Sequence, residues 1–241
     1  MEIKLFGYNV FSGTLSDLVG RLLAARDQSS LHHVVTLNSE MVVLAERNLI
    51  IKKWLTKADT IVADGYGIRA AINVLGKGNV NIITGVRLMI QLLQQKGMSF
   101  YFVGSTEDIV TQTVYNVKKQ YPDIDVVGSS SGFFSEFDVP CIIDSILKAK
   151  PDVILVGMGF PKQEYFIQTL SQYYQAGIAI GVGGGFDILA GSKKLAPQWI
   201  NTIGCEWIYR TFQDPKRILR WKYLFYYIIF TLQHMFSFEK E

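Results

Sequence analysis

VILVGMGFPKQE, residues 153–164, contains in order the end of a strand, a glycine turn and the start of a helix. Its first four residues are apolar without interruption, as in a strand that is buried on both faces. Gly157 and Gly159 then lead the chain away from the strand, and Pro161 fits the first turn of a helix. This order of elements is typical of one strand of a parallel sheet followed by its helix.

Two polar residues follow this turn. Lys162 and Gln163 stand at the start of the expected helix, so we expect them at a cleft beyond the carboxyl end of the strand. There the lysine would meet a phosphate, and the glutamine would donate a hydrogen bond to a sugar or a base.

The same alternation of strand and helix repeats along the chain. Further short apolar runs predict strands at residues 33–37, 60–63, 99–103, 125–127 and 178–182. Helical patterns cover residues 15–26, 41–55, 106–120, 137–149 and 163–174, with Thr14 or Ser16, Ser39, and Thr106 or Asp108 as candidate caps. We predict an α/β fold with a Rossmann-like parallel sheet flanked by helices over residues 1–197. Residues 198–241 form a separate helical C-terminal appendage in this prediction.

Composition narrows the class of protein. The 241 residues are 49% hydrophobic and 19% charged, which is too apolar for a disordered chain. The formal net charge of +3 is too small to indicate nucleic-acid binding by itself. Two cysteines exclude both a disulfide framework and a zinc site made of cysteines. We find neither a signal peptide nor 18 consecutive apolar residues, so we expect a cytoplasmic protein without a spanning helix.

Three further polar or glycine-rich segments follow predicted strands: residues 36–40, 63–67 and 181–187. Asp64, followed by Gly65 and Gly67, could act as a general base that accepts a hydroxyl proton. The first two segments also have ordinary explanations, because Ser39 fits a helix cap and Asp-Gly is a common turn.

The third segment, residues 181–187, has so many glycines that backbone contact with a bulky or anionic ligand is expected. Phe186 stands where a dinucleotide fingerprint needs its last glycine, which disfavours a hydride-transfer enzyme.

Asp123-Ile124-Asp125 matches the Asp-x-Asp pattern that holds a divalent metal in many sugar-nucleotide transferases. It directly follows Pro122 and precedes a predicted strand, which is the wrong end of the strand for the cleft. We therefore predict no metal site and no cofactor.

The last part of the chain carries the charge. The window from Arg210 to Lys222 contains five cationic residues and one acidic residue, Asp214. Asp214 followed by Pro215 predicts the start of a helix. Residues 221–238 are aromatic and apolar but too short to span a membrane. Aromatic residues beside cations favour a membrane interface, although an interface between copies of the chain also fits.

Taken in order, these segments resemble the WecG/TagA/CpsF family of glycosyltransferases. The resemblance covers nearly the whole chain and rests on the following positions: Thr36, Asn38, Asp64, Gly65, Gly67, Thr84, Gly85, Gly157, Gly159, Pro161 to Glu164, Gly181 to Gly184, Phe186, Asp187, Gly191, Ala196, Pro197, Trp199, Gly204 to Arg210, Pro215, Arg217 and Arg220.

The resemblance implies an inverting, metal-independent transfer of a hexose from a UDP-sugar to a lipid-diphosphate-linked saccharide. The hexose would be of the ManNAc, ManNAcA or GlcA class, and the product would enter a cell-surface polysaccharide or a teichoic acid. The enzyme would work at the cytoplasmic face of the bacterial membrane, as a peripherally bound protein.

The resemblance also implies roles for residues. Asp64 is the proposed base, and Arg210, Arg217 and Arg220 bind the acceptor diphosphate from an appendage that closes on the site. The remaining positions form the expected donor site: Thr36, Asn38, Gly65, Gly67, Thr84, Arg87, Gly159, Pro161, Lys162, Gln163, Glu164, Gly183, Gly184, Phe186 and Asp187.

One segment departs from the family pattern. The family usually has Arg-Val-Thr-Gly-x-Asp where this chain reads Ile82-Ile83-Thr84-Gly85-Val86-Arg87. We hypothesise that Arg87 restores a cation near the donor or binds the carboxylate of an acidic sugar. The alternative is a surface arginine on the first turn of a helix.

Two other functions remain open from the sequence. One is a nucleotide- or NAD-dependent Rossmann-type oxidoreductase, and the other is a non-catalytic, membrane-associated assembly protein that binds lipid without releasing UDP.

Overall fold

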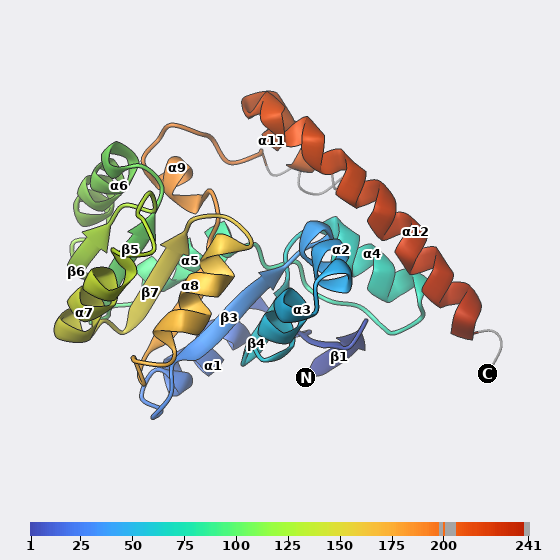
Figure 1. Cartoon of the computed structure of the whole chain (residues 1–241), viewed down its shortest axis with the longest axis horizontal. Coiled ribbons are helices and arrows are strands. Elements are labelled where there is room, and N and C mark those ends of the chain that lie inside the picture. Colours follow the sequence, from blue (N-terminus) through green and yellow to red (C-terminus); the bar gives the residue numbers. More distant parts are fainter. Residues whose placement is uncertain (198–199, 201–205, 239–241) are drawn as a thin grey trace.

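A computed structural model of the chain describes residues 1–197, 200 and 206–238. Its centre is one eight-stranded sheet with the order β1-β2-β4-β3-β8-β7-β5-β6 (Figure 1). β1 and β2 pair antiparallel, and the other neighbouring strands pair parallel. The strands are β1 (Glu2–Leu5), β2 (Tyr8–Phe11), β3 (His32–Leu37), β4 (Thr60–Ala63), β5 (Ser99–Gly104), β6 (Asp125–Ser130), β7 (Val153–Gly157) and β8 (Ile178–Gly181).

Helices cover both faces of the sheet and then continue past it. Those of the α/β part are α1 (Leu15–Ala25), α2 (Ser39–Arg47), α3 (Leu49–Thr56), α4 (Tyr66–Val74), α5 (Gly85–Leu93), α6 (Glu107–Gln120), α7 (Val139–Ala149), α8 (Lys162–Leu170) and α9 (Gly185–Leu189). The C-terminal elements are α11 (Glu206–Gln213), the 3-10 helix η1 (Pro215–Arg220) and α12 (Trp221–Phe238). The predicted fold class, a largely parallel sheet flanked by helices, is confirmed.

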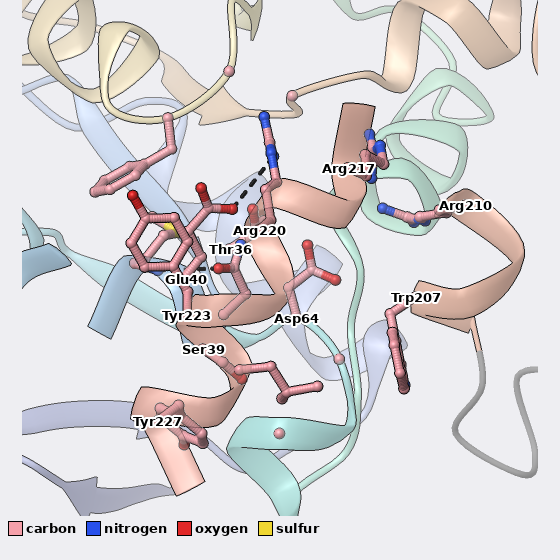
Figure 2. Close-up of a pocket in the computed structure, with 18 of the residues that line it drawn as sticks. Thr36, Ser39, Glu40, Asp64, Trp207, Arg210, Arg217, Arg220, Tyr223 and Tyr227 are labelled. Carbon is pink, nitrogen blue, oxygen red and sulfur yellow. Dashed lines mark hydrogen bonds and ion pairs between the residues drawn. The ribbon is translucent and has the colours of Figure 1, made fainter. Parts of the chain in front are cut away.

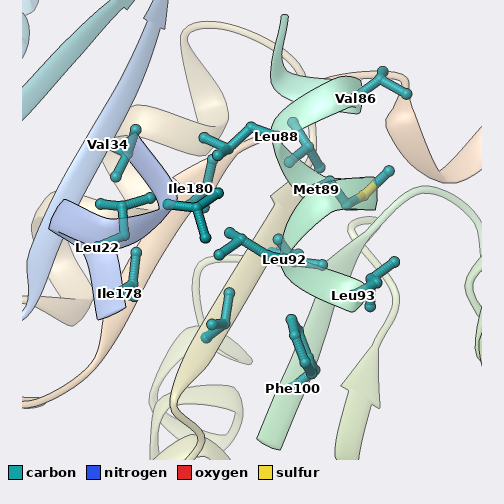
Figure 3. Packing of buried hydrophobic residues seen from close by; sticks show 14 of the residues in the cluster. Leu22, Val34, Val86, Leu88, Met89, Leu92, Leu93, Phe100, Ile178 and Ile180 are labelled. Carbon is teal, nitrogen blue, oxygen red and sulfur yellow. The ribbon is translucent and has the colours of Figure 1, made fainter. Parts of the chain in front are cut away.

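Alternate residues of the central strands pack into opposite layers. Val34 of β3 and Ile178 of β8 belong to the cluster formed with α1 and α5, which Figure 3 shows with Leu22 and Leu92. The next residue of β3, Val35, belongs to the cluster on the other face, with helices α2, α3 and α4. Both faces of the strands are therefore dry, which explains why these segments are apolar without alternation.

The structure corrects several predicted boundaries. The hairpin β1–β2 and α4 were not predicted, and α5 was considered only as the helix on which Arg87 would be a surface residue. The helix expected over residues 41–55 is two helices, α2 and α3, because Asn48 ends the first and caps the second. Asn38, not Ser39, caps α2 by accepting a hydrogen bond from the Met41 N–H. Thr14 and Thr106 cap α1 and α6 as predicted.

The C-terminal helices lie along one edge of the α/β part. α12 packs on α2 and α4 (Figure 1), and the Phe6 ring lies 4.8 Å from the ring of Phe230. The predicted helix start at Asp214 and Pro215 is a 3-10 helix, and the Asp214 side chain makes no capping hydrogen bond. The predicted boundary at residue 198, and Trp199, Gly204 and Cys205 of the family pattern, lie outside the described residues. Within the described ranges, no helix combines the length and apolarity that crossing a membrane requires.

Candidate active site

A cavity of about 810 Å³ runs along the carboxyl ends of the parallel strands. Six strands each contribute to its floor, in the order of the sheet, through Asp64, Asn38, Gly183, Met158, Ser105 and Phe133. Its roof comes from α11, η1 and α12 and includes Trp207, Arg210, Arg217, Arg220 and Tyr223 (Figure 2). The cavity therefore joins the two parts of the chain that were predicted separately.

Asp64 stands where β4 ends, with its side chain in this cavity (Figure 2). Its backbone N–H donates to the Leu37 carbonyl at 2.8 Å, which fixes the residue beside the neighbouring strand β3. Burial raises the pKa of its carboxyl to about 6, opposed mainly by the positive charge of Arg210 and reinforced by Glu206. A carboxylate with such a pKa is a stronger base than an exposed aspartate, yet it is ionised at neutral pH.

Three arginines of the C-terminal helices face the same space. Arg210 pairs with Glu206, and Arg217 Nε lies 3.7 Å from an oxygen of Asp214. Burial, together with the nearby charges of Arg210 and Arg220, lowers the pKa of Arg217. Cations held this close to one another repel, so an anion between them would be strongly favoured.

Glycines of the floor let the backbone come close to a ligand. Gly183 has a φ of 52° and Gly159 a φ of 74°, and residues with a side chain rarely adopt such positive values. A side chain on Gly184 would lie 3.6 Å from Nη2 of Arg217, so this loop and the arginine border the same space. Backbone N–H groups and a guanidinium that border the same space can together bind a diphosphate.

A buried chain of hydrogen bonds lies behind the floor. Gln163 Oε1 accepts from the Gly183 N–H at 3.1 Å, and its Nε2 donates to Glu164 Oε1 at 3.1 Å. The other oxygen of Glu164 lies 2.8 Å from Nε2 of His33, and Glu164 is fully buried. Gln163 lines the cavity, but Glu164 does not, so Glu164 holds Gln163 and with it the glycine loop.

Most of the predicted site residues meet in this cavity. The predicted residues that line it are Thr36, Asn38, Asp64, Gly65, Gly67, Gly159, Lys162, Gln163, Gly183, Gly184, Arg210, Arg217 and Arg220. A Cβ added at Gly67 would meet Oγ of Ser39, so any larger residue there would require the Ser39 side chain to turn away.

Other predicted donor residues lie outside the cavity lining, as Glu164 does. Phe186 is fully buried, with its ring 5.5 Å from that of Phe102. Thr84 caps α5 by accepting from the Arg87 N–H, and Arg87 itself is exposed on the first turn of that helix. Asp187 pairs with Lys193 at 3.0 Å. Pro161 precedes α8 and is also absent from the lining. None of these residues is among those that line the cavity.

Several lining residues were not predicted, among them Ser105, Gly132, Phe133 and Met158. Ser105 lies two residues after the strand predicted over residues 99–103, so its position near a strand end was available as a signal. Phe133 follows the end of β6, which extends to Ser130 rather than to residue 127.

The Asp-x-Asp pattern lies at the amino end of β6, as predicted, because Asp125 is the first residue of that strand. Asp123 pairs with Lys96 at 2.9 Å. Within residues 1–197, 200 and 206–238, no three His, Cys, Asp or Glu side chains are grouped as a metal site would need.

Comparison with known proteins gives consistent matches. A family model described as "Glycosyl transferase WecG/TagA/CpsF family" matches residues 3–240. An N-acetylglucosaminyldiphosphoundecaprenol N-acetyl-beta-D-mannosaminyltransferase of Bacillus spizizenii is 31% identical over 211 residues, covering 86% of this chain and 81% of that protein. A Staphylococcus aureus (strain MW2) protein of the same name is 30% identical over 226 residues, covering 92% and 88%.

Proposed function

Because the chain belongs to the WecG/TagA/CpsF family of glycosyltransferases, we propose that it moves a hexose from UDP to a lipid-diphosphate-linked saccharide. The observation that carries this proposal is Asp64, a carboxylate with a pKa of about 6 in a cavity shared with Arg210 and Arg217. The relatives' names support a hexose of the ManNAc class and an acceptor of the GlcNAc-diphosphoundecaprenol type. The oxidoreductase and the non-catalytic assembly protein receive no support from these matches.

The proposed reaction is a single displacement. Asp64 takes the proton of an acceptor hydroxyl while that oxygen attacks the anomeric carbon of the donor. The bond between this carbon and the UDP oxygen breaks, its electron pair leaves with UDP, and the configuration at carbon inverts. The proton remains on Asp64 until water removes it.

The leaving diphosphate gains negative charge during this step. Arg217 and the Gly183–Gly184 loop border one space, so we assign the developing charge to the Arg217 guanidinium and to loop N–H groups other than that of Gly183, which already donates to Gln163 Oε1. Fixed donors of this kind stabilise charge without reorganising. No step of the proposed mechanism uses a metal ion.

The lipid-linked acceptor is assigned to the end of the cavity between α4 and α12. Apolar side chains line that end: Ala70, Val74, Leu224, Ile228 and Leu232. Apolar walls suit a polyprenyl chain, and Asp64 lies between them and the glycine loops along the cavity floor.

The outer face of α12 supports peripheral binding to the inner face of the cell membrane. Its exposed side chains include Phe225, Ile229 and Phe236, whereas Tyr227 on the inner face is buried. A helix with such an apolar outer face, beside cations such as Lys222, suits a bilayer interface. We expect Phe225→Ser with Phe236→Ser to weaken binding to vesicles with anionic lipids. If vesicle binding is unchanged, a surface other than the outer face of α12 binds the membrane.

A transfer assay tests the function. The full chain is incubated with UDP-ManNAc, UDP-ManNAcA or UDP-GlcA and a short-chain GlcNAc-diphosphate lipid, and both UDP and the disaccharide lipid are measured. We expect both products in equal amounts with one of the donors. UDP release that does not depend on the acceptor, or no release with any donor, would contradict the proposal.

A further inference from the structure

We propose that Gln213 is a positioning residue that holds Arg217 at the active-site cavity (Figure 2). This inference rests on the proposed function, because that function assigns the charge of the leaving diphosphate to Arg217. Gln213 does not line the active-site cavity, so it acts through the arginine and not on the substrate. It is also absent from the positions that carry the family pattern described above.

The 3-10 helix η1, which carries Arg217, is not buried in the core. Its apolar side chains Ile218 and Leu219 are 56% and 72% exposed, and η1 packs on α11 and α12. The preceding helix α11 has no buried residue along its described length, Glu206–Gln213. Apolar burial of these two helices therefore does not set the position of Arg217 above the floor.

Space that no side chain fills also adjoins Arg217. A small cavity of about 40 Å³ is lined by Arg217, Gly184, Lys194 and Gln213, among others. Arg217 lines both this small cavity and the larger active-site cavity, whereas Lys194 and Gln213 line the small one but not the larger. Close packing alone therefore does not fix the guanidinium, and Gln213 stands near it without meeting the substrate.

Gln213, the last residue of α11, is hydrogen-bonded to both backbone groups of Lys194. The Lys194 N–H donates to Gln213 Oε1 at 2.8 Å, and Gln213 Nε2 donates to the Lys194 carbonyl at 2.9 Å. A primary amide has one acceptor oxygen and one donor NH2 group, so it matches the N–H and C=O of a single residue. Two such bonds fix both the distance and the orientation of the end of α11 relative to Lys194.

Lys194 belongs to a segment that is itself fixed to the floor. The N–H of its neighbour Lys193 donates to the Asp187 carbonyl at 3.0 Å, and Lys193 Nζ lies 3.0 Å from an oxygen of the Asp187 carboxylate. Asp187 is part of α9, which begins directly after Gly184 and whose Phe186 is fully buried. A continuous connection therefore runs from the glycine loop through α9 and Lys194 to the end of α11.

Asp214 links Gln213 to Arg217. It follows Gln213 directly, its carbonyl accepts from the Arg217 N–H at 3.0 Å, and its carboxylate lies 3.7 Å from Arg217 Nε. Lys193 Nζ lies 3.8 Å from the same carboxylate. The contact between Gln213 and Lys194 thus positions both the backbone and the side chain of Arg217 relative to the glycine loop.

Steady-state kinetics of hexose transfer by the full chain tests the inference with Gln213→Met. Methionine is similar in size to glutamine but can make neither of the two hydrogen bonds. Since a displaced Arg217 stabilises the developing charge less well, we expect kcat to fall roughly tenfold and the KM for the UDP-sugar to stay within about twofold. Gln175→Met is the matched control, because it removes a hydrogen bond from an exposed glutamine to the Ser171 carbonyl and should leave both values unchanged.

A double-mutant cycle separates positioning of Arg217 from a general structural role. If Gln213 acts through Arg217, adding Gln213→Met to Arg217→Ala should change kcat by less than about twofold. A fall by the same factor in both backgrounds would overturn the inference. So would a kcat of Gln213→Met equal to that of the parent, or a loss confined to the melting temperature.

Hydrogen exchange measures the contact without using activity. The Lys194 amide should be protected in the parent and in Gln175→Met and should lose this protection in Gln213→Met. Equal exchange of this amide in all three proteins would also overturn the inference. A parent chain that transfers no hexose would remove the proposed function and the positioning role together, whereas failure of this inference alone leaves transfer by the parent intact.

Discussion

The two walls of the cavity are built in different ways. The floor consists of loops that leave buried parallel strands, and its polar groups are tied into the core, as with Gln163, which is only 4% exposed. The roof consists of C-terminal helices whose charges pair near the surface, as with Arg220 and Glu40 at 3.3 Å, where the arginine side chain is 55% exposed. Exposed ion pairs contribute little to stability. Changes in the floor should therefore affect folding and catalysis together, whereas changes in the roof should affect mainly catalysis.

The largest effect on activity is expected from Asp64→Asn, at the floor residue closest to the proposed chemistry. An amide cannot accept the hydroxyl proton, and general bases contribute about a hundred- to ten-thousandfold. We expect kcat to fall by that amount with little change in the KM for UDP-sugar. Steady-state kinetics with the lipid acceptor measures both values, and a rate within threefold of the parent would remove Asp64 from the role of base.

The same variant should not lose stability at neutral pH. The pKa of Asp64 is about 6 in the folded chain against an ordinary value of 3.8, so the folded state binds its proton more tightly than the unfolded state does. The unfolding free energy therefore falls as the pH rises from about 4 to about 6, by an amount on the order of 3 kcal/mol. A neutral amide in place of this carboxylate escapes that cost, so Asp64→Asn should melt higher than the parent at pH 7.5 and show a smaller advantage at pH 4. A lower melting temperature at pH 7.5 would contradict the burial of the carboxylate.

In the roof, Arg217→Ala is expected to cost the next largest amount. Removal of one donor to developing charge typically raises the barrier by about 3–4 kcal/mol, a factor of a hundred to a thousand in kcat. The melting temperature should change little, because Arg217 pairs only loosely with Asp214 at 3.7 Å. A large fall in melting temperature with little change in kcat would show that the roof, like the floor, is needed for folding.

In the floor, Glu164→Gln should affect both folding and function. Both Gln163 Nε2 and His33 Nε2 now lie within hydrogen-bond distance of an oxygen of Glu164. The NH2 group of a glutamine at this position would point its hydrogens at one of these two nitrogens. A buried donor without an acceptor costs about 1–3 kcal/mol of unfolding free energy. Because Gln163 holds the Gly183 N–H, the donor KM should rise several-fold while kcat changes less. Glu107→Gln, an exposed residue of α6, is the matched control, and equal behaviour of the two variants would remove the positioning role of Glu164.

The smallest effect is expected from Arg87→Ala. The side chain is exposed and does not line the cavity, so activity with neutral and with acidic UDP-sugars should stay within about twofold. The same kinetic assay with UDP-ManNAc and UDP-ManNAcA measures this. A selective loss with the acidic donor would restore the carboxylate contact considered from the sequence.

The sequence predicted the parallel strands well, because segments such as Val153–Gly157 are buried on both faces and therefore consist of apolar residues without interruption. It missed the hairpin Glu2–Leu5 and Tyr8–Phe11, because each strand has only four residues and the edge strand β1 is largely exposed. The glycine motifs located the floor of the cavity, because each motif follows a parallel strand and the carboxyl ends of parallel strands lie along one edge of the sheet.

Motifs failed where the direction of a side chain decides its role. Gln163 and Glu164 are consecutive on a helix, so they point about 100° apart and only one of them lines the cavity. Phe133 was missed because its place at the cavity depends on the close approach of its neighbour Gly132 to Gly104 and Met158, which no local pattern records.

The most direct test of the account is the pH dependence of kcat/KM for the donor, measured from pH 4.5 to 8.5 with parent and Asp64→Asn. The base must be deprotonated to act, so the parent value should rise with pH through a pKa of about 6 and level off above pH 7. The residual activity of Asp64→Asn should lack this step. A parent profile without a transition near pH 6, or the same transition in both proteins, would contradict the assignment of Asp64 as the base.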